Sequence, residues 1–387
     1  MRVLLFSGKG GAGKTTISSA TALHAASHGH RVLIVSTDLA HSLADLLEGP
    51  CAQSKWQVER NVLAMEVDVL SELSRLWSEL KDYLAELLTY FGFSTLMAEE
   101  AMLLPGVAEF FVLSAVLDAA ESNEVDLVAV DCGPTADTMR MLGFADSAPD
   151  RIRKFLKLQK SVVAMLRPFR KSVEVPLPSE SALDQLGPLA DRADRIRRLI
   201  TDRQTTSVRL VVNPDSLSIA ETRRLYTYLN LFGMNIDFVV ANKFAPDEWR
   251  NFLPDMLDQH LGYFSEIESS FPLETAKVFQ RHAEIKGKDK LKDIGLQVYG
   301  ERDPAEIFKS PPPMEYDRDE TGRPLLRLPL SVADKSQLAV RQQGPHLLIK
   351  AGAFVRMIAL PDSLTNAAIA NARLDQGTLL IRFDNKG

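Results

Sequence analysis

Cysteine is scarce in this chain of 387 residues, because only Cys51 and Cys132 occur and they lie far apart. Two distant thiols provide no C-x-x-C motif, the spacing typical of structural zinc sites and redox-active disulfides. Low cysteine usage is also typical of proteins that stay in a reducing compartment. We therefore expect a cytoplasmic protein with no zinc and no iron–sulfur cluster.

The sequence also lacks a long uninterrupted apolar segment and an excess of basic residues. Its most apolar stretch, residues 101–120, is interrupted by Pro105 and Glu109, so it does not predict a membrane span. Acidic residues number 51 against 45 lysines and arginines, which argues against a nucleic-acid-binding protein. The first apolar run begins at residue 3, so we expect no signal peptide.

What the sequence does have is a glycine-rich loop directly after that first apolar run. Residues 7–16 read S-G-K-G-G-A-G-K-T-T. Glycines allow successive backbone N–H groups to turn toward a phosphate chain, and the helix that follows adds its positive end. Lys14 can reach the terminal phosphates, and the Thr15 hydroxyl can join a Mg²⁺ shell. We predict that ATP and Mg²⁺ bind here, through Gly8, Lys9, Gly10, Gly11, Ala12, Gly13, Lys14, Thr15 and Thr16.

Lys9 distinguishes this loop from a general nucleotide-binding loop, which needs no lysine directly after its first glycine. The pattern G-K-G-G-x-G-K-T-T resembles the deviant Walker A ATPases, a class that includes ArsA, MinD and the nitrogenase iron protein. The resemblance implies that Lys9 crosses a homodimer interface to the partner's nucleotide, where added positive charge assists phosphoryl transfer. A solvated surface lysine is the alternative.

Short apolar runs alternate with helical patterns over the first 300 residues. Continuous runs predict strands buried on both faces, and hence a doubly wound, mostly parallel α/β sheet whose ligands bind beyond the carboxyl ends of its strands. Residues 70–122 and 150–203 are helical and interrupt the alternation, so we expect helical insertions there. The expected strands are residues 3–6, 31–36, 63–67, 127–131, 209–212 and 238–242.

A proline-rich stretch near residues 310–313 precedes a different kind of sequence. Short strand patterns punctuated by glycine and proline predict a small all-β sandwich, and residues 364–383 resemble the α-crystallin domain of small heat-shock proteins. We expect this module to dock on the ATPase or to bind partners. The predicted domains are residues 1–305 for a P-loop ATPase, 306–322 for a linker and 323–387 for the sandwich.

Two aspartates follow predicted strands at the edge where the glycine-rich loop lies. Asp38, within S-T-D-L-A-H-S, could orient the attacking water, or it could be a helix N-cap. Asp131 closes an apolar strand pattern, where a carboxylate can hold Mg²⁺ through its waters. A purely structural aspartate is the alternative at residue 131.

These segments resemble the motifs of the ArsA and tail-anchored-protein-targeting ATPase family, D-P-A-H-S and D-T-A-P-T-G-H-T-L-R. Leu39 and Asp137 replace a proline and a histidine of the family. The resemblance implies three catalytic residues and four switch residues. The catalytic residues are Lys9, Lys14 and Asp38, and the switch residues are His41, Ser42, Pro134 and Thr135.

The resemblance also implies residues for the adenine base and for a client. Asn242 would hydrogen-bond adenine, although either Asn213 or Asn242 could instead cap a turn. Pro272 and Ile285 would belong to the adenine loop. The P-G-x-x-E segment at 105–109 marks a groove for an apolar client, although the same helical spacing suits an ordinary core. The groove candidates are Leu96, Met97, Met102, Phe110 and Phe111.

The family resemblance thus implies a Mg²⁺-dependent ATPase that converts ATP and water to ADP and phosphate. It would act as a homodimeric switch for a hydrophobic client, and a membrane-associated receptor could be a further partner. One alternative is an arsenite-pump subunit, although two distant cysteines do not cluster thiolates. Others are an ATP-binding holdase without turnover, an electron-transfer protein with a shared cluster, and a MinD-like membrane positioner, which would need a basic amphipathic helix.

Overall fold

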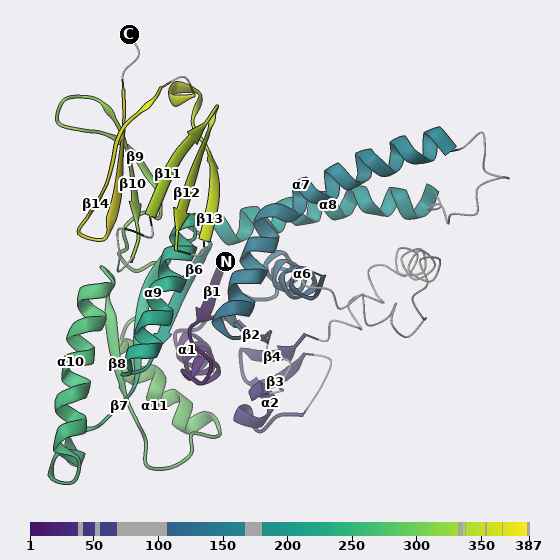
Figure 1. Ribbon diagram of the computed structural model, residues 1–387. Coiled ribbons are helices and arrows are strands. Elements are labelled where there is room, and N and C mark those ends of the chain that lie inside the picture. The colour runs from purple at the N-terminus through teal and green to yellow at the C-terminus, as the bar shows by residue number, and fades with distance from the viewer. Residues whose placement is uncertain are drawn as a thin grey trace, which may run out of the picture.

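The computed structural model describes residues 1–37, 42–50, 55–67, 107–166, 180–331, 336, 338–352, 354–365 and 367–384. Within these ranges, a large α/β body carries a smaller all-β unit near the C-terminus (Figure 1). The fold class predicted from the sequence is confirmed.

The body is built on an eight-stranded sheet in the order β3-β4-β2-β5-β1-β6-β7-β8. All neighbouring strands are parallel except β3 and β4. The expected strands are present, whereas β3 and β8, at the two edges, were not predicted. The strands are β1 (Arg2–Ser7), β2 (Val32–Ser36), β3 (Trp56–Glu59), β4 (Val62–Glu66), β5 (Leu127–Asp131), β6 (Thr206–Val212), β7 (Ile236–Phe244) and β8 (Thr275–Phe279).

Helices cover both faces of this sheet. Successive side chains of a strand point to opposite faces, so Val3 and Leu5 join one core, while Leu4 and Phe6 join the other. The first core is shared with α6 (Val107–Glu121), α7 (Thr135–Leu166), α8 (Glu180–Thr201), α9 (Ser216–Leu231) and α10 (Pro254–Ser270). The second is shared with α1 (Lys14–Ser27), α2 (Ser42–Leu47) and α11 (Lys288–Tyr299). A 3-10 helix, η2 (Asp247–Asn251), precedes α10.

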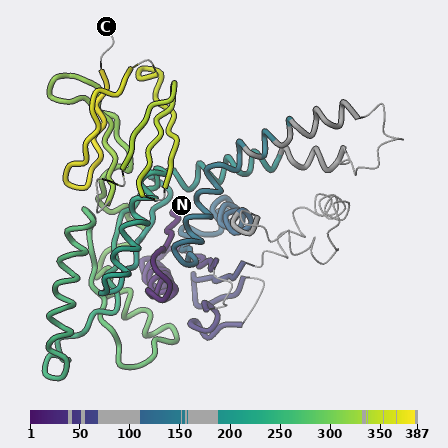
Figure 2. Tube along the Cα trace, in the orientation of Figure 1, coloured from purple at the N-terminus to yellow at the C-terminus, as the bar shows by residue number. Residues whose placement is uncertain are grey.

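The helical insertion expected from residue 150 begins earlier than predicted. Helix α7 starts at Thr135 and continues for 32 residues, although Pro149 lies inside it. It packs along α8, and the two helices extend away from the sheet (Figure 2). The segment that follows β5 therefore leads directly into a long helix rather than into a separate insertion.

The C-terminal unit is a sandwich of two antiparallel sheets, β14-β15-β10-β9 and β11-β12-β13. Apolar residues of both sheets share one core, as the predicted sandwich requires. Its strands are β9 (Glu315–Arg318), β10 (Pro324–Pro329), β11 (Leu338–Gln343), β12 (His346–Ala351), β13 (Phe354–Ala359), β14 (Ile369–Asp375) and β15 (Thr378–Phe383), with a 3-10 helix, η4 (Asp362–Leu364), before β14.

The stretch expected as a linker, residues 306–322, contributes residues to both the α/β body and the sandwich. Phe308 is buried in the core that α1 and α11 form, and β9 pairs with β10 inside the sandwich. The Ser310 hydroxyl donates to the Asn235 side chain at 3.2 Å. The domain boundaries at 305 and 323 stay predictions, but the residues between them are held at both ends.

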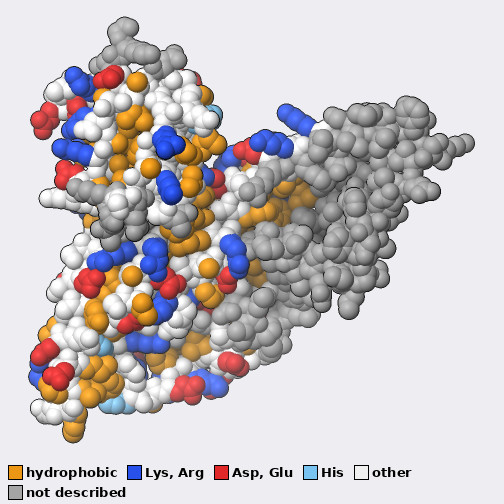
Figure 3. All heavy atoms as spheres, viewed as in Figure 1, with side chains coloured by type: hydrophobic (Ala, Val, Ile, Leu, Met, Phe, Trp, Pro, Cys, Tyr) orange, Lys and Arg blue, Asp and Glu red, His pale blue; other side chains and the backbone are white. Residues whose placement is uncertain are grey.

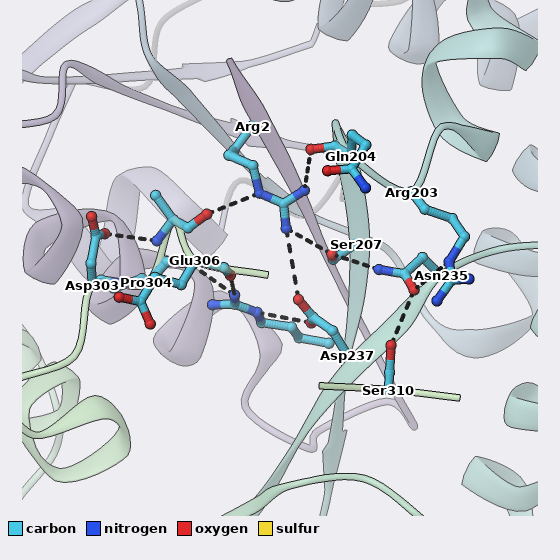
Figure 4. Close-up of polar contacts among 12 residues, drawn as sticks. Arg2, Arg203, Gln204, Ser207, Asn235, Asp237, Asp303, Pro304, Glu306 and Ser310 are labelled. Carbon is cyan, nitrogen blue, oxygen red and sulfur yellow. Dashed lines mark hydrogen bonds and ion pairs between the residues drawn. The ribbon is translucent and has the colours of Figure 1, made fainter. Parts of the chain in front are cut away.

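A buried ion cluster fixes this part of the chain to the central strands (Figure 4). Arg209 and Asp237 are fully buried and pair at 3.3 Å, and Arg2 lies 3.7 Å from the same carboxylate. The Arg209 guanidinium also donates to the Pro304 carbonyl at 2.7 Å, and Arg2 donates to that of Ala305 at 3.0 Å. One carboxylate therefore balances two buried guanidinium groups that hold the chain after α11.

Replacing this carboxylate should destabilise the body strongly. In an Asp237→Ala variant two buried arginines would face each other without a counter-charge, and such losses cost about 3–5 kcal/mol. Urea denaturation followed by circular dichroism measures the change. The control is Asp258→Ala, which breaks an exposed pair with Arg250 and should leave the midpoint nearly unchanged. Equal midpoints for the two variants would contradict this account of the cluster.

Candidate functional site

The glycine-rich loop lies at the carboxyl edge of the sheet, between the ends of three strands. In the register of the sheet, Phe6 aligns with Asp131 of β5 and Ser7 aligns with Leu210 of β6. Ser36, the last residue of β2, also aligns with Asp131. The loop after β1 therefore emerges directly beside the carboxylate that closes β5, as the sequence predicts.

The glycines of the loop serve two different purposes. A Cβ at Gly8 would lie 2.1 Å from the Val211 carbonyl oxygen, and a Cβ at Gly13 would lie 2.4 Å from the Asn242 side chain. A Cβ at Gly10 or Gly11 would meet nothing within 4 Å. One side of the loop is thus packed against β6 and β7, and the other side is open. Gly11 and Gly13 also have positive φ angles of 76° and 95°, which favour glycine.

Side chains from the ends of β6 and β7 hold the carbonyl groups of the loop. The Asn242 amide donates to the Ala12 carbonyl at 2.8 Å, and the Lys243 ammonium donates to that of Gly11 at 2.7 Å. Asn213 donates to the Gly11 carbonyl at 3.5 Å. Lys243 was missed by the sequence analysis. Its φ of +61° is uncommon for a residue with a side chain. In this conformation its ammonium reaches the Gly11 carbonyl.

Helix α1 begins at the end of this loop with an N-terminus suited to an anion. Its N-cap is Gly13, which provides no side-chain hydrogen bond, and its first turn has no acidic residue. The first backbone N–H groups of a helix have no partner within the helix and carry partial positive charge. The open side of the loop and the start of α1 together fit a phosphate group.

The two lysines of the loop have different surroundings. Lys14 is 8% exposed, and its ammonium donates to the Lys9 carbonyl at 3.3 Å. The Lys9 ammonium is partly exposed and lies 3.5 Å from a carboxylate oxygen of Asp215. Asp215 also caps α9 by accepting from the Ser218 backbone N–H at 2.8 Å. Lys9 is therefore held by its own chain in this structure, by a residue that the sequence analysis did not single out.

Hydrogen bonds connect the ends of β1 and β2 to the segment that follows β5. Asp131 is 1% exposed, and its carbonyl accepts from the Thr37 backbone N–H at 3.0 Å. The Ser7 hydroxyl donates to that of Thr138 at 2.9 Å, and the Thr37 hydroxyl accepts from Gly133 N–H at 2.9 Å. The predicted switch residues Pro134 and Thr135 lie between these bonds, where α7 begins. The polar ends of β1, β2 and β5 thus converge on the start of one helix.

Cys132 follows Asp131 and is buried, with 1% exposure. Burial, with a further contribution from the negative charge of Asp131, raises the pKa of its thiol to about 12. Thiolates rather than thiols bind soft metals, so this neutral buried thiol is a poor ligand for iron or arsenite. The nearby Lys14 acts in the opposite direction and lowers the same pKa, which shows that Lys14 and Asp131 both act on this position.

Several predicted residues lie outside the described part of the chain or next to it. Asp38 and His41 are outside the described residues, as are Leu96, Met97 and Met102. The predicted switch residue Ser42 begins α2, whose backbone is held by Glu66, a buried residue at the end of β4 that accepts from Ala44 N–H at 3.1 Å.

The adenine predictions have three different outcomes. Asn242 lies at the site, where its amide nitrogen is engaged by the Ala12 carbonyl. Ile285 follows β8, at the same edge of the sheet, and stays a prediction. The prediction for Pro272 is wrong, because this residue precedes β8 and lies at the opposite edge, where it lines a cavity with Ser331. The resemblance placed Pro272 in the adenine loop. A loop at the nucleotide edge of the sheet must follow β8, whereas Pro272 precedes this strand.

Phe110 and Phe111 of α6 are buried, with exposures of 2% and 0%. Their rings lie 5.9 Å apart, and Phe110 lies 6.2 Å from Phe144 of α7. This packing favours the alternative of an ordinary helical core for these two residues in this structure.

Among the described residues, no helix is both long enough and apolar enough to cross a membrane.

Comparisons with known proteins agree with this geometry. The family model described as anion-transporting ATPase matches residues 1–300, and that of the HSP20-like domain found in ArsA matches residues 322–383. A putative arsenical pump-driving ATPase of Chlorobaculum tepidum is 32% identical over 390 residues, which cover 99% of this chain and 96% of the relative.

Two other relatives differ in how much of the chain they share. The putative arsenical pump-driving ATPase 1 of Aquifex aeolicus is 29% identical over 394 residues, covering 98% of this chain and 99% of its own. ATPase GET3C of Arabidopsis thaliana is 29% identical over 325 residues, covering 76% of this chain and 81% of its own. The glycine loop, the parallel sheet and these matches together show that the chain belongs to the anion-transporting (ArsA) ATPase family and carries the HSP20-like domain found in that family.

Proposed function

We propose that this protein is a Mg²⁺-dependent ATPase that acts as a homodimeric switch for a hydrophobic client. The observation that carries the proposal is the loop between β1 and α1, which is packed against β6 and β7 on one side and open on the other. Lys14 follows the loop as the first residue of α1, and Asp131 ends the neighbouring strand β5. A cytoplasmic location and a membrane-associated receptor belong to the same proposal.

The residues at the loop fit a nucleotide with its magnesium ion. The open side of Gly10 and Gly11 accommodates phosphate, and Lys14 provides the positive charge for its terminal oxygens. The hydroxyl of Thr15 and the buried carboxylate of Asp131 are hard oxygen donors, the type that Mg²⁺ prefers, with water completing its shell. When bound, the ion neutralises charge that develops on the transferred phosphoryl group.

In this proposal Asp38 orients the attacking water and Lys9 acts across the dimer. The Lys9–Asp215 pair is partly exposed, with side-chain exposures of 32% and 45%, and such pairs contribute about 0–1 kcal/mol. A phosphate chain with several negative charges can therefore replace Asp215 as the partner of Lys9. The local pair holds the lysine in one chain until a second copy brings a nucleotide within reach.

A second candidate function is supported by the names of two relatives, which are putative arsenical pump-driving ATPases. Arsenite binding by clustered thiolates requires exposed cysteines close together. Cys132 is buried, and burial raises its pKa to about 12. We therefore favour the client-binding switch over an arsenite-driven pump subunit. A holdase that binds ATP without turnover differs from both in its kinetics.

Removal of the Lys14 ammonium should abolish most ATP turnover. A Lys14→Ala variant loses the positive charge at the terminal phosphates, and we expect kcat to fall by about 100-fold or more. Steady-state phosphate release measures the effect. The control is Lys292→Ala, which removes an exposed lysine of α11 paired with Glu59 and should keep full activity. A wild-type chain that binds ATP without releasing phosphate would support the holdase alternative.

An Asp38→Asn variant should bind ATP but hydrolyse it slowly, because the attacking water loses the carboxylate that orients it. We expect kcat to fall by about 10²- to 10⁴-fold and the ATP-bound dimer to accumulate. Light scattering during gel filtration with Mg-ATP measures the dimer, and the added change Lys9→Ala should return the chain to monomer. Clients can be identified by copurification with the single variant. A monomeric Asp38→Asn chain in saturating ATP would contradict the dimeric switch.

Arsenite should leave the ATPase rate unchanged. The buried, protonated Cys132 and the distance in sequence to Cys51 argue against a thiolate cluster. Phosphate release is measured with and without arsenite, for the wild type and for Cys132→Ser. A severalfold stimulation that is lost in the cysteine variant would establish the pump-type alternative instead.

A further inference from the structure

Helix α7 connects the nucleotide site with the C-terminal sandwich. Its first turn is tied to the phosphate loop through the Thr138 hydroxyl, which accepts from the Ser7 hydroxyl at 2.9 Å. Asp146 lies on the same helix, eleven residues after Thr135, or about 16 Å along the axis at 1.5 Å per residue. A displacement at the start of α7 therefore reaches Asp146 through a rigid element.

The sandwich contacts this helix at Asp146. Arg356 of β13 forms a two-pronged ion pair with the Asp146 carboxylate, and one of its two bonds measures 2.8 Å. The guanidinium also lies over the ring of Phe232, 4.3 Å from its centre. Both charged side chains are mostly buried, with exposures of 22% and 25%. Bidentate arginine–carboxylate pairs fix orientation as well as distance, so this contact selects one position of α7.

Helix α9 contacts both α7 and the sandwich. The Tyr228 hydroxyl donates to the Met139 carbonyl of α7, and a Cβ at Gly143 would lie 2.5 Å from that hydroxyl. The Tyr228 ring packs against Phe232 and, at 5.1 Å, against Phe354 of β13. Figure 3 shows apolar side chains at the surface where the sandwich meets the helices. Elements α7, α9 and β13 thus meet in one packed junction.

We infer that Arg356 is a positioning residue for the nucleotide site, acting through Asp146 and helix α7. The inference rests on the proposed function, because it concerns the affinity for ATP. The ion pair holds α7 in the position in which Thr138 bonds to Ser7, at the start of the phosphate loop. The pair therefore stabilises the arrangement of the loop that is open to phosphate, and it supports ATP binding.

This assignment follows from linkage between two equilibria. A contact that exists in one arrangement and is weakened in another shifts the balance between them, and it changes ligand affinity by the same factor. The segment at 132–135 leads from β5 into α7, and its Gly133 N–H donates to the Thr37 hydroxyl after β2, so a shift of α7 moves groups beside the phosphate loop. Loss of the Asp146–Arg356 pair should free α7, weaken its support of the loop and weaken ATP binding.

The test is equilibrium binding of a fluorescent ATP analogue to the full chain with Mg²⁺. We expect Arg356→Gln and Asp146→Asn each to bind the analogue about five- to tenfold more weakly than the wild type. A charge-swapped chain with Arg356→Asp and Asp146→Arg should return toward wild-type affinity. Hydrogen exchange of residues 135–146 without nucleotide should be faster in both single variants, because the helix has lost its anchor.

Arg382→Gln is the matched control. It breaks an ion pair of similar burial with Asp319 inside the sandwich, at 3.0 Å, and leaves the junction with α7 intact. Its affinity for the analogue should equal that of the wild type. Unchanged or tighter binding in both single variants, or the same change in Arg382→Gln, would overturn the inference. Failure of the wild type to bind the analogue would instead contradict the proposed function.

Discussion

The close approach of the glycine-rich loop to the end of β6 is the constraint on which the site depends. At Gly8 the backbone of the loop comes so near the Val211 carbonyl that no side chain fits between them. This contact holds the loop against β6, and Asn242 of β7 fixes its other half. Because β6 is buried throughout, β7 is buried except at Lys243, and the two strands are paired in parallel, the loop takes its shape from the sheet. A phosphate bound there, as proposed, would therefore meet a loop that the sheet already shapes, and its binding need not order the loop.

Helix α7 connects this loop with the C-terminal sandwich. The bond between Ser7 and Thr138 joins the loop to α7, and the ion pair between Asp146 and Arg356 joins α7 to the sandwich. The sandwich is thus placed where it contacts the element that leaves the nucleotide site. A domain attached only by a flexible linker could not have this influence. Here the connecting residues are held too, by Phe308 and by the buried charges around Arg209.

Much of this arrangement could be predicted from local sequence patterns, and the rest depends on contacts between distant segments. The central strands are continuous apolar runs, so their pattern is strong. Strand β8 reads T-A-K-V-F at a half-buried edge and β9 reads E-Y-D-R with every residue exposed, so neither shows an apolar pattern. Lys243 and Asp215 gain their roles only because β7 and α9 bring them to the loop. Pro272 was misplaced because a short resemblance to the family's adenine loop does not tell which edge of a parallel sheet a turn occupies.

The contacts of the two loop lysines differ in a way that suits the proposed action of Lys9 between two chains. Lys14 is nearly buried and bonded within the loop, so its position does not depend on a second chain. Lys9 is partly exposed, and among the described residues its ammonium is held by a weak, solvent-screened pair with Asp215. Asp215 keeps its capping bond to α9 whether or not the lysine stays, so release of Lys9 leaves no buried charge without a partner. A residue that leaves its place at so little cost is suited to exchange partners between chains, whereas Lys14 is suited to remain.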